Sequence, residues 1–145
     1  MRSLALATIG CLAAAGSLLL QGCAGLGCND IGAFSGLVFH LDLPEGVQPT
    51  SATVRLVVEG RTYEYACGSG DFARSSSCGL GKSSVSVDMN VSSEPSPLDL
   101  RLTLDEGAFV FEGTVRPSYE TDEPWGEGCG FNTVGTATVA PVPVP

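Results

Sequence analysis

Cysteine is the residue type whose spacing most constrains the chemistry available to this sequence. Six cysteines occur, at positions 11, 23, 28, 67, 78 and 129. In an oxidising compartment cysteines form disulfides, whereas close pairs of them bind zinc. The last four contain no C-x-x-C pair, and the chain has only 1 histidine. The spacing therefore favours disulfides over a metal site.

The first 22 residues have the pattern of an export signal. Met1-Arg2-Ser3 is a short basic start, residues 4–20 form an apolar run, and Gln21-Gly22 leads to Cys23. The run is slightly shorter than the roughly 20 residues that span a bilayer, so a permanent transmembrane anchor is less favoured than a cleaved signal. Removing residues 1–22 also removes Cys11. An exported chain with an odd number of cysteines then remains, so one thiol has no partner for an intramolecular disulfide and must be modified in another way.

The residues before Cys23 indicate how that thiol is modified. Leu20-Gln21-Gly22-Cys23 resembles the lipobox of bacterial lipoproteins, with Leu three residues before the Cys and Gly directly before it. The resemblance implies that Cys23 carries a thioether-linked diacylglycerol and becomes the acylated first residue of the mature chain. Ala24 after it implies transfer to the outer membrane in a bacterium that has one. The alternative is ordinary cleavage between residues 13 and 16, which would release a free secreted protein.

With Cys23 lipidated, the other four cysteines form an even set with three alternative pairings. We expect Cys67 to pair with Cys78 and thereby close the loop 68–77. We expect Cys28 to pair with Cys129, which would tie the start of the domain to the segment before its last strand. The predicted fold is therefore stapled by disulfides.

Charge excludes some classes of partner. Without Arg2 the chain keeps 6 basic residues against 16 acidic ones, a net charge of −10. The basic residues are scattered singly, so no row of them could neutralise nucleic-acid phosphates. Membrane attachment must come from the lipid anchor, because polybasic segments are absent.

Period-two alternation of apolar residues predicts about seven strands. The predicted strands cover residues 36–43, 52–58, 61–67, 83–91, 98–104, 109–115 and 133–139. Two pairs read as hairpins, one turning at Glu59-Gly60 and one at residues 105–107. The sequence predicts an all-β, antiparallel β-sandwich of immunoglobulin-like or transthyretin-like kind at residues 36–140. A lipidated cysteine and tether at residues 23–35 would precede it, and an extended, loosely held Pro-Val tail at 141–145 would follow.

Two groups of residues are candidates for a site. His40 and Asp42 lie on the same side of one strand, which is typical of a solvated face more often than of a metal or catalytic site. Residues 119–127 combine carboxylates with two aromatics; the candidate metal ligands are Glu120, Asp122, Glu123 and Glu127, and the candidate stacking residues are Tyr119 and Trp125. These would bind Ca²⁺, or a sugar or partner. The spacing lacks the order of a calcium loop, so a solvated acidic loop is favoured and no cofactor is expected.

The leading functional prediction is therefore non-enzymatic. We expect a lipoprotein of the bacterial cell envelope whose sandwich binds another envelope protein or a polysaccharide, or has a structural role. One alternative is an accessory or inhibitor protein that presents the 68–77 disulfide loop. Another is a calcium- or carbohydrate-binding module that uses the 119–127 loop. No G-x-S-x-G motif occurs, and His40 is the only candidate general base, so no enzyme is predicted.

Overall fold

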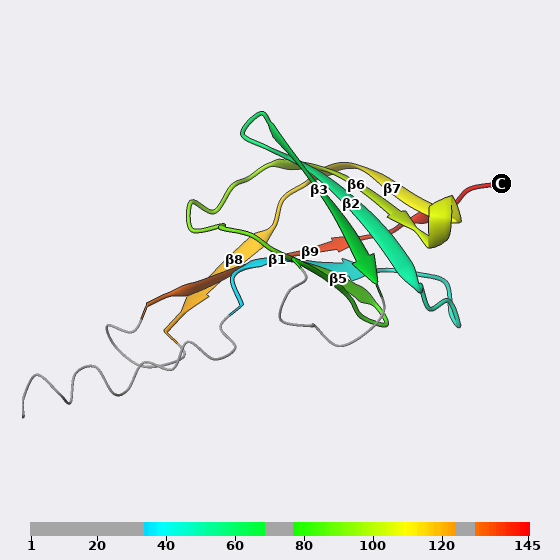
Figure 1. The fold of residues 1–145 in the computed structure, drawn as a ribbon, viewed down its shortest axis with the longest axis horizontal. Coiled ribbons are helices and arrows are strands. Elements are labelled where there is room, and N and C mark those ends of the chain that lie inside the picture. Colours follow the sequence, from blue (N-terminus) through cyan, green and yellow to red (C-terminus); the bar gives the residue numbers. More distant parts are fainter. Residues whose placement is uncertain (1–33, 69–76, 124–129) are drawn as a thin grey trace, which may run out of the picture.

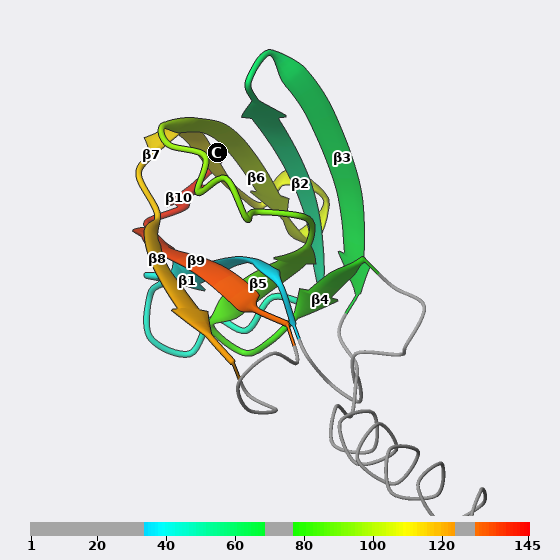
Figure 2. The same cartoon turned by 90° about the vertical axis from the view of Figure 1, so that its left-hand side faces the viewer.

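The computed structural model describes residues 34–68, 77–123 and 130–145, which form an all-β sandwich of two five-stranded sheets (Figures 1 and 2). Sheet A has the order β4-β5-β1-β9-β8 and sheet B the order β10-β7-β6-β2-β3. The strands of sheet A are β4 (Cys78–Leu80), β5 (Ser84–Asp88), β1 (Gly36–Leu41), β9 (Asn132–Val139) and β8 (Ser118–Asp122). Those of sheet B are β10 (Val142–Pro143), β7 (Phe109–Val115), β6 (Leu98–Leu104), β2 (Ser51–Val58) and β3 (Arg61–Gly68). The predicted fold class is confirmed.

The core lies between the two sheets and follows the alternation in the sequence. In β6 the four leucines at even positions are almost completely buried, while Asp99 and Arg101 between them are exposed. In β1, Leu37 and Phe39 are fully buried and His40 is exposed. Each buried leucine, valine or phenylalanine contributes about 1.5 to 3 kcal/mol relative to an exposed one. Burial of one face per strand thus fixes which side of each sheet faces inward.

Both predicted hairpins are present in sheet B. In the β2–β3 hairpin Val58 lies opposite Arg61, so Glu59 and Gly60 form a two-residue turn. Their φ values are 50° and 78°. Two residues with positive φ are what a type I′ turn requires, and glycine adopts that conformation without steric cost. The β6–β7 hairpin turns through a short 3-10 segment, η1 (Asp105–Gly107).

The structure corrects the expected strand count, because it has ten strands and not about seven. The three additional strands are β4, β8 and β10, which have 3, 5 and 2 residues and lie at the edges of the sheets. β4 lies in the segment expected to be a loop after Gly68, and β8 in the expected acidic loop. β10 lies in the tail, where the Val144 N–H also donates to the Ala108 carbonyl at 3.0 Å. Such short strands lack an alternating apolar pattern, because each buries few side chains.

One pairing in the otherwise antiparallel sheets is parallel. β1 pairs in parallel with β9, from Gly36 opposite Val134 to Leu41 opposite Val139. These two strands come from the start and the end of the sandwich domain. A parallel pair needs a long crossover, and here most of the chain between β1 and β9 provides it. Local sequence patterns carry no information about such a pairing.

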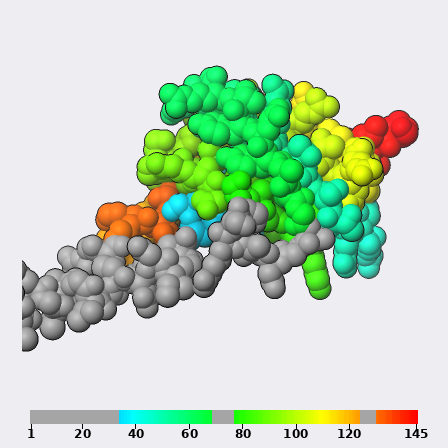
Figure 3. Space-filling view, in the orientation of Figure 1, coloured from blue at the N-terminus to red at the C-terminus, as the bar shows by residue number. Residues whose placement is uncertain are grey.

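One end of sheet A gathers several strand ends, and we call it the entry end because the chain enters β1 there after Phe34. The strand ends at the entry end are Gly36, Cys78, Asp88, Asp122 and Asn132. In Figures 1 and 3 the light-blue start of β1 lies beside the orange ends of β8 and β9, while the C-terminus lies on the opposite side of the molecule. Ser77, which precedes β4, and Asp122, which ends β8, both lie at this entry end. The fold thus brings described residues of both candidate segments to the same end of the sheet as the start of the domain.

Asp105 connects the β6–β7 turn to the start of β2, and its removal should weaken the sandwich. Its Oδ1 accepts hydrogen bonds from the Thr50 N–H at 2.7 Å, the Thr50 hydroxyl at 2.9 Å and the Ser51 N–H at 3.1 Å. The Thr50 backbone N–H is the main cause that lowers the pKa of Asp105. We expect Asp105→Ala to lower the free energy of unfolding by about 1 kcal/mol, because the bonds are partly exposed and alanine disfavours the φ of 46° found there.

The effect of Asp105 should depend on pH. A carboxyl group whose pKa is lowered by folding stabilises the folded state above its unfolded pKa of about 3.9, and this contribution is lost as the pH falls through the folded pKa. The stabilities of the natural protein and of Asp105→Asn in urea unfolding should therefore differ at pH 6 and converge as the pH falls through the lowered pKa of Asp105. Asparagine is the matched control, because it keeps an acceptor oxygen and tolerates positive φ. A pH-independent difference would contradict the role of the charge.

Candidate functional site

The confirmed disulfide joins the two sheets. Cys67 lies in β3 at the edge of sheet B, Cys78 lies in β4 at the edge of sheet A, and the two are bonded with their Cα atoms 5.0 Å apart. Each cysteine is only 4% exposed. The Asp88 N–H also donates to the Ser77 carbonyl at 2.8 Å, next to Cys78. The bond therefore fixes both ends of the predicted 68–77 loop, whose residues 69–76 lie outside the described residues.

Several predicted site residues cannot be placed in the structure. Cys23, Cys28 and Cys129 lie outside the described residues, and so do Trp125 and Glu127. The lipid anchor and the Cys28–Cys129 disulfide therefore stay predictions. So does the pairing of Tyr119 with Trp125 as a stacking platform.

Tyr119 itself is a packing residue at the edge of sheet A. It is half-buried against the core, and its hydroxyl donates a hydrogen bond to the Pro95 carbonyl at 2.6 Å. Burial, followed by the negative charge of Glu94, raises the pKa of Tyr119 to about 12. The hydroxyl therefore stays a neutral donor at physiological pH. Its ring covers Gly135, where a Cβ atom would come within 2.5 Å of Tyr119 Cε1.

The acidic residues of β8 lie on its outward side. Tyr119 is half-buried, and the hydroxyl of the exposed Thr121 lies 3.0 Å from that of Thr133. Glu120 and Asp122 alternate with them and are exposed, while Glu123 follows the strand and is half-buried. Within residues 34–68, 77–123 and 130–145, no group of three or more His, Cys, Asp or Glu side chains is arranged to hold a metal ion. Glu120 and Asp122 are therefore two neighbouring carboxylates on one strand.

His40 and Asp42 lie on the exposed side of sheet A. His40 is opposite Ser84 of β5 and Thr138 of β9. Asp42 follows β1, and its N–H donates to the Val139 carbonyl at 2.8 Å. Both residues are exposed, which agrees with the solvated face expected from the alternation.

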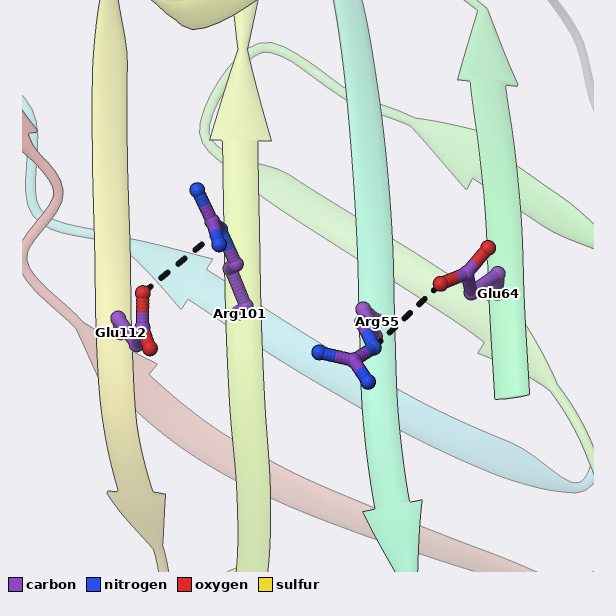
Figure 4. A network of polar contacts seen from close by, with 4 residues as sticks. All are labelled: Arg55, Glu64, Arg101 and Glu112. Atoms are coloured by element: carbon purple, nitrogen blue, oxygen red, sulfur yellow. Dashed lines mark ion pairs between the residues drawn. The ribbon is translucent and has the colours of Figure 1, made fainter. Parts of the chain in front are cut away.

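Two ion pairs form a row of four charged side chains across the outward face of sheet B, which we call the charge ladder (Figure 4). The ladder consists of Glu64, Arg55, Arg101 and Glu112, one from each of β3, β2, β6 and β7. Arg55 Nε lies 3.4 Å from Glu64 Oε1, and Arg101 Nε lies 3.7 Å from Glu112 Oε2. Arg55 and Arg101 are directly opposite each other on neighbouring strands. Two of the few basic side chains of an acidic protein are thus adjacent.

The charge ladder adds little to the stability of the fold. Exposed ion pairs typically contribute about 0.2 to 1 kcal/mol each, and all four side chains are more than half exposed. Like charges directly opposite each other on paired strands are destabilising by a similar amount. The two arginines also line two shallow hollows, of about 280 and 370 Å³, on this face. The ladder therefore offers guanidinium groups to solvent at a place where stability does not require them.

The charge ladder was not predicted from the sequence, although its Arg55–Glu64 pair could have been. The two-residue turn at Glu59-Gly60 sets the register that places Arg55 opposite Glu64. The adjacency of Arg55 and Arg101 depends on β2 lying beside β6, which no local pattern indicates.

Among the described residues, no helix has the length and apolar character needed to cross a bilayer. In the comparison with known proteins, no protein family, curated protein or solved structure matches the chain.

Proposed function

We propose that the chain is the precursor of a lipoprotein of the bacterial cell envelope, anchored through Cys23, whose β-sandwich is a non-enzymatic binding or structural module. The observation that carries the proposal is the Cys67–Cys78 disulfide. A structural disulfide is typical of exported proteins, because the cytosol keeps thiols reduced. With this pair formed, Cys23, Cys28 and Cys129 are the cysteines left after the signal. Two of them can pair with each other and one is left over. The residues before Cys23 resemble a lipobox.

The position of the domain start is compatible with such an anchor. The described chain begins at Phe34 and enters β1 at Gly36, so a segment of 10 residues separates Cys23 from Phe34. We propose that this segment is the tether between the anchor and the domain. In an organism with two membranes, Ala24 after the lipidated cysteine favours the outer membrane as the final location.

The surface that we assign to partner contact is the outward face of sheet B around the charge ladder. Arg55 and Arg101 present planar guanidinium groups, which suit carboxylates of an envelope protein or a polysaccharide. Glu64 and Glu112 flank the pair on both sides. A long stretch of negative charge would be repelled by these glutamates, so an isolated carboxylate is the better fit.

Mass spectrometry of the protein extracted from membranes tests the anchor. We expect a mature chain that begins at Cys23 and is heavier than its sequence by a diacylglycerol and an acyl chain. A Cys23→Ser variant should lack this mass and should leave the membrane fraction, while Cys67 and Cys78 still pair. A mature chain that begins at another residue would contradict the proposal.

The same preparation tests partner contact. A partner cross-linked to the natural protein should be lost with the Arg55→Ala/Arg101→Ala double variant and kept with Lys82→Ala. Lys82 is the matched control, because it is an exposed cation outside the charge ladder. Equal recovery with both variants would exclude the charge ladder as the contact surface.

A further inference from the structure

The aromatic side chain of Phe131 is exposed at the entry end of the sandwich. Phe131 directly precedes β9, and 70% of its surface is accessible, the highest value among the large hydrophobic residues that the structure describes as exposed. It lines a shallow hollow of about 340 Å³ together with Ser35, Met89 and Asn90. The other exposed large hydrophobics, Val142 and Val144, lie near the C-terminus. An apolar side chain is thus presented at the end where the chain enters the domain.

Hydrogen bonds fix the entering chain beside Phe131. The Ser35 hydroxyl accepts from the Thr133 N–H at 3.3 Å, and the Ser35 carbonyl accepts from the Met89 N–H at 3.2 Å. Ser35 therefore bridges the start of β9 and the residue after β5. The segment that leads back to Cys23 must leave the domain from this point, next to the exposed ring.

We propose that Phe131 enters the headgroup region of the membrane that anchors Cys23, so that the domain stands on the bilayer by its entry end. This proposal rests on the lipid anchor proposed above. The chain between Cys23 and Phe34 can span at most about 40 Å when fully extended, so the entry end stays close to the bilayer surface. Aromatic residues at membrane interfaces bury their apolar part among the lipids and leave polar neighbours in water.

Whether one aromatic residue can orient the domain on the membrane depends on the lipid anchor. Even a single 14-carbon acyl chain binds membranes only marginally, so Phe131 alone would not recruit a free domain. A short flexible linker raises the effective concentration to the millimolar range, where a weak contact orients a domain that is already held. Phe131 should therefore set the orientation of the anchored domain and contribute little to its affinity.

The charge near Phe131 indicates which lipid surface fits. Asp88 lines the same hollow, and Glu120 and Asp122 are exposed on β8, which ends at the entry end. These carboxylates would be repelled by anionic lipids. The surface that we propose is therefore zwitterionic.

Hydrogen exchange of the full lipidated protein on phosphatidylcholine vesicles tests this orientation. We expect the amides of residues 130–134 and 88–92 to exchange several-fold more slowly than in the unlipidated chain from Ala24, whether or not vesicles are added to that chain. Phe131→Ser should remove the protection, and Phe131→Trp should keep it. Val142→Ser is the matched control, because Val142 is 61% exposed but lies in β10.

Three outcomes would overturn the proposal. Equal protection in the natural protein and Phe131→Ser would show that the ring does not contact the lipid. Protection of the unlipidated chain without vesicles would show that another part of the protein covers Phe131. A mass without acyl chains would remove the anchor itself, so failure of the proposed function can be told from failure of the orientation.

Discussion

Replacing Cys67 and Cys78 together by alanine should lower the free energy of unfolding by about 3 kcal/mol. The bond closes a loop with a sequence separation of 11 residues. The chain-entropy account gives about 3 kcal/mol for a loop of this size, because the bond restricts the unfolded chain. The bond also joins the edges of sheets A and B, where β3 and β4 meet without sharing a hydrogen-bonded ladder. Its loss should therefore loosen one side of the sandwich first.

Urea unfolding with and without a reducing agent measures this effect. The natural protein should lose stability on reduction, whereas the double alanine variant should respond only through any other disulfide in the chain. Non-reduced peptide mapping of the natural protein should join the peptides that contain Cys67 and Cys78. A double variant as stable as the natural protein would show that packing alone holds the two edges together.

Replacing Gly135 by alanine should destabilise the protein by about 2 to 3 kcal/mol. A Cβ atom at this position would lie 2.5 Å from Tyr119 Cε1 and 2.8 Å from Leu37 Cδ2. Leu37 is completely buried, and the Tyr119 hydroxyl is bonded to the Pro95 carbonyl, so neither side chain can move aside easily. Adding atoms to a filled core costs about 1 to 3 kcal/mol, and contact with two constrained side chains favours the upper part of that range.

A pair of control variants separates crowding from any general effect of alanine in a strand. Gly68→Ala is the matched control, because no atom lies within 4 Å of a Cβ built at Gly68. In a Tyr119→Ala background the cost of Gly135→Ala should fall, since the closest contact is removed. Thermal or urea unfolding of the natural protein, Gly135→Ala, Tyr119→Ala and the double variant gives the coupling energy between the two residues. An equal cost of Gly135→Ala in both backgrounds would contradict the contact between Tyr119 and Gly135.

The row that contains Gly135 extends across the whole of sheet A. Cys78, Val87, Leu37, Gly135 and Tyr119 lie opposite one another on β4, β5, β1, β9 and β8. The disulfide is at one end of this row, and the Tyr119 hydrogen bond to Pro95 is at the other. The two largest predicted effects therefore concern opposite edges of the same sheet.

Local patterns in the sequence identified seven of the ten strands, both hairpins and the Cys67–Cys78 bond. Alternating side chains predict strands because one face of each must be buried, and short turns fix hairpin register. The same reasoning could have paired Arg55 with Glu64. It did not predict β8, because the segment that carries Glu120 and Asp122 was expected to be a loop.

Outside the two hairpins, tertiary structure alone determined which strands are neighbours. The parallel pairing of β1 with β9 and the adjacency of Arg55 and Arg101 both join segments whose relation depends on how two sheets close around a common core. Each such contact brings together residues from different hairpins or distant strands, and the free energy that selects it comes from burial summed over the whole sandwich. For the same reason the sequence could indicate an anchor at Cys23, whereas only the fold placed Phe131 beside the point where the anchored chain would enter.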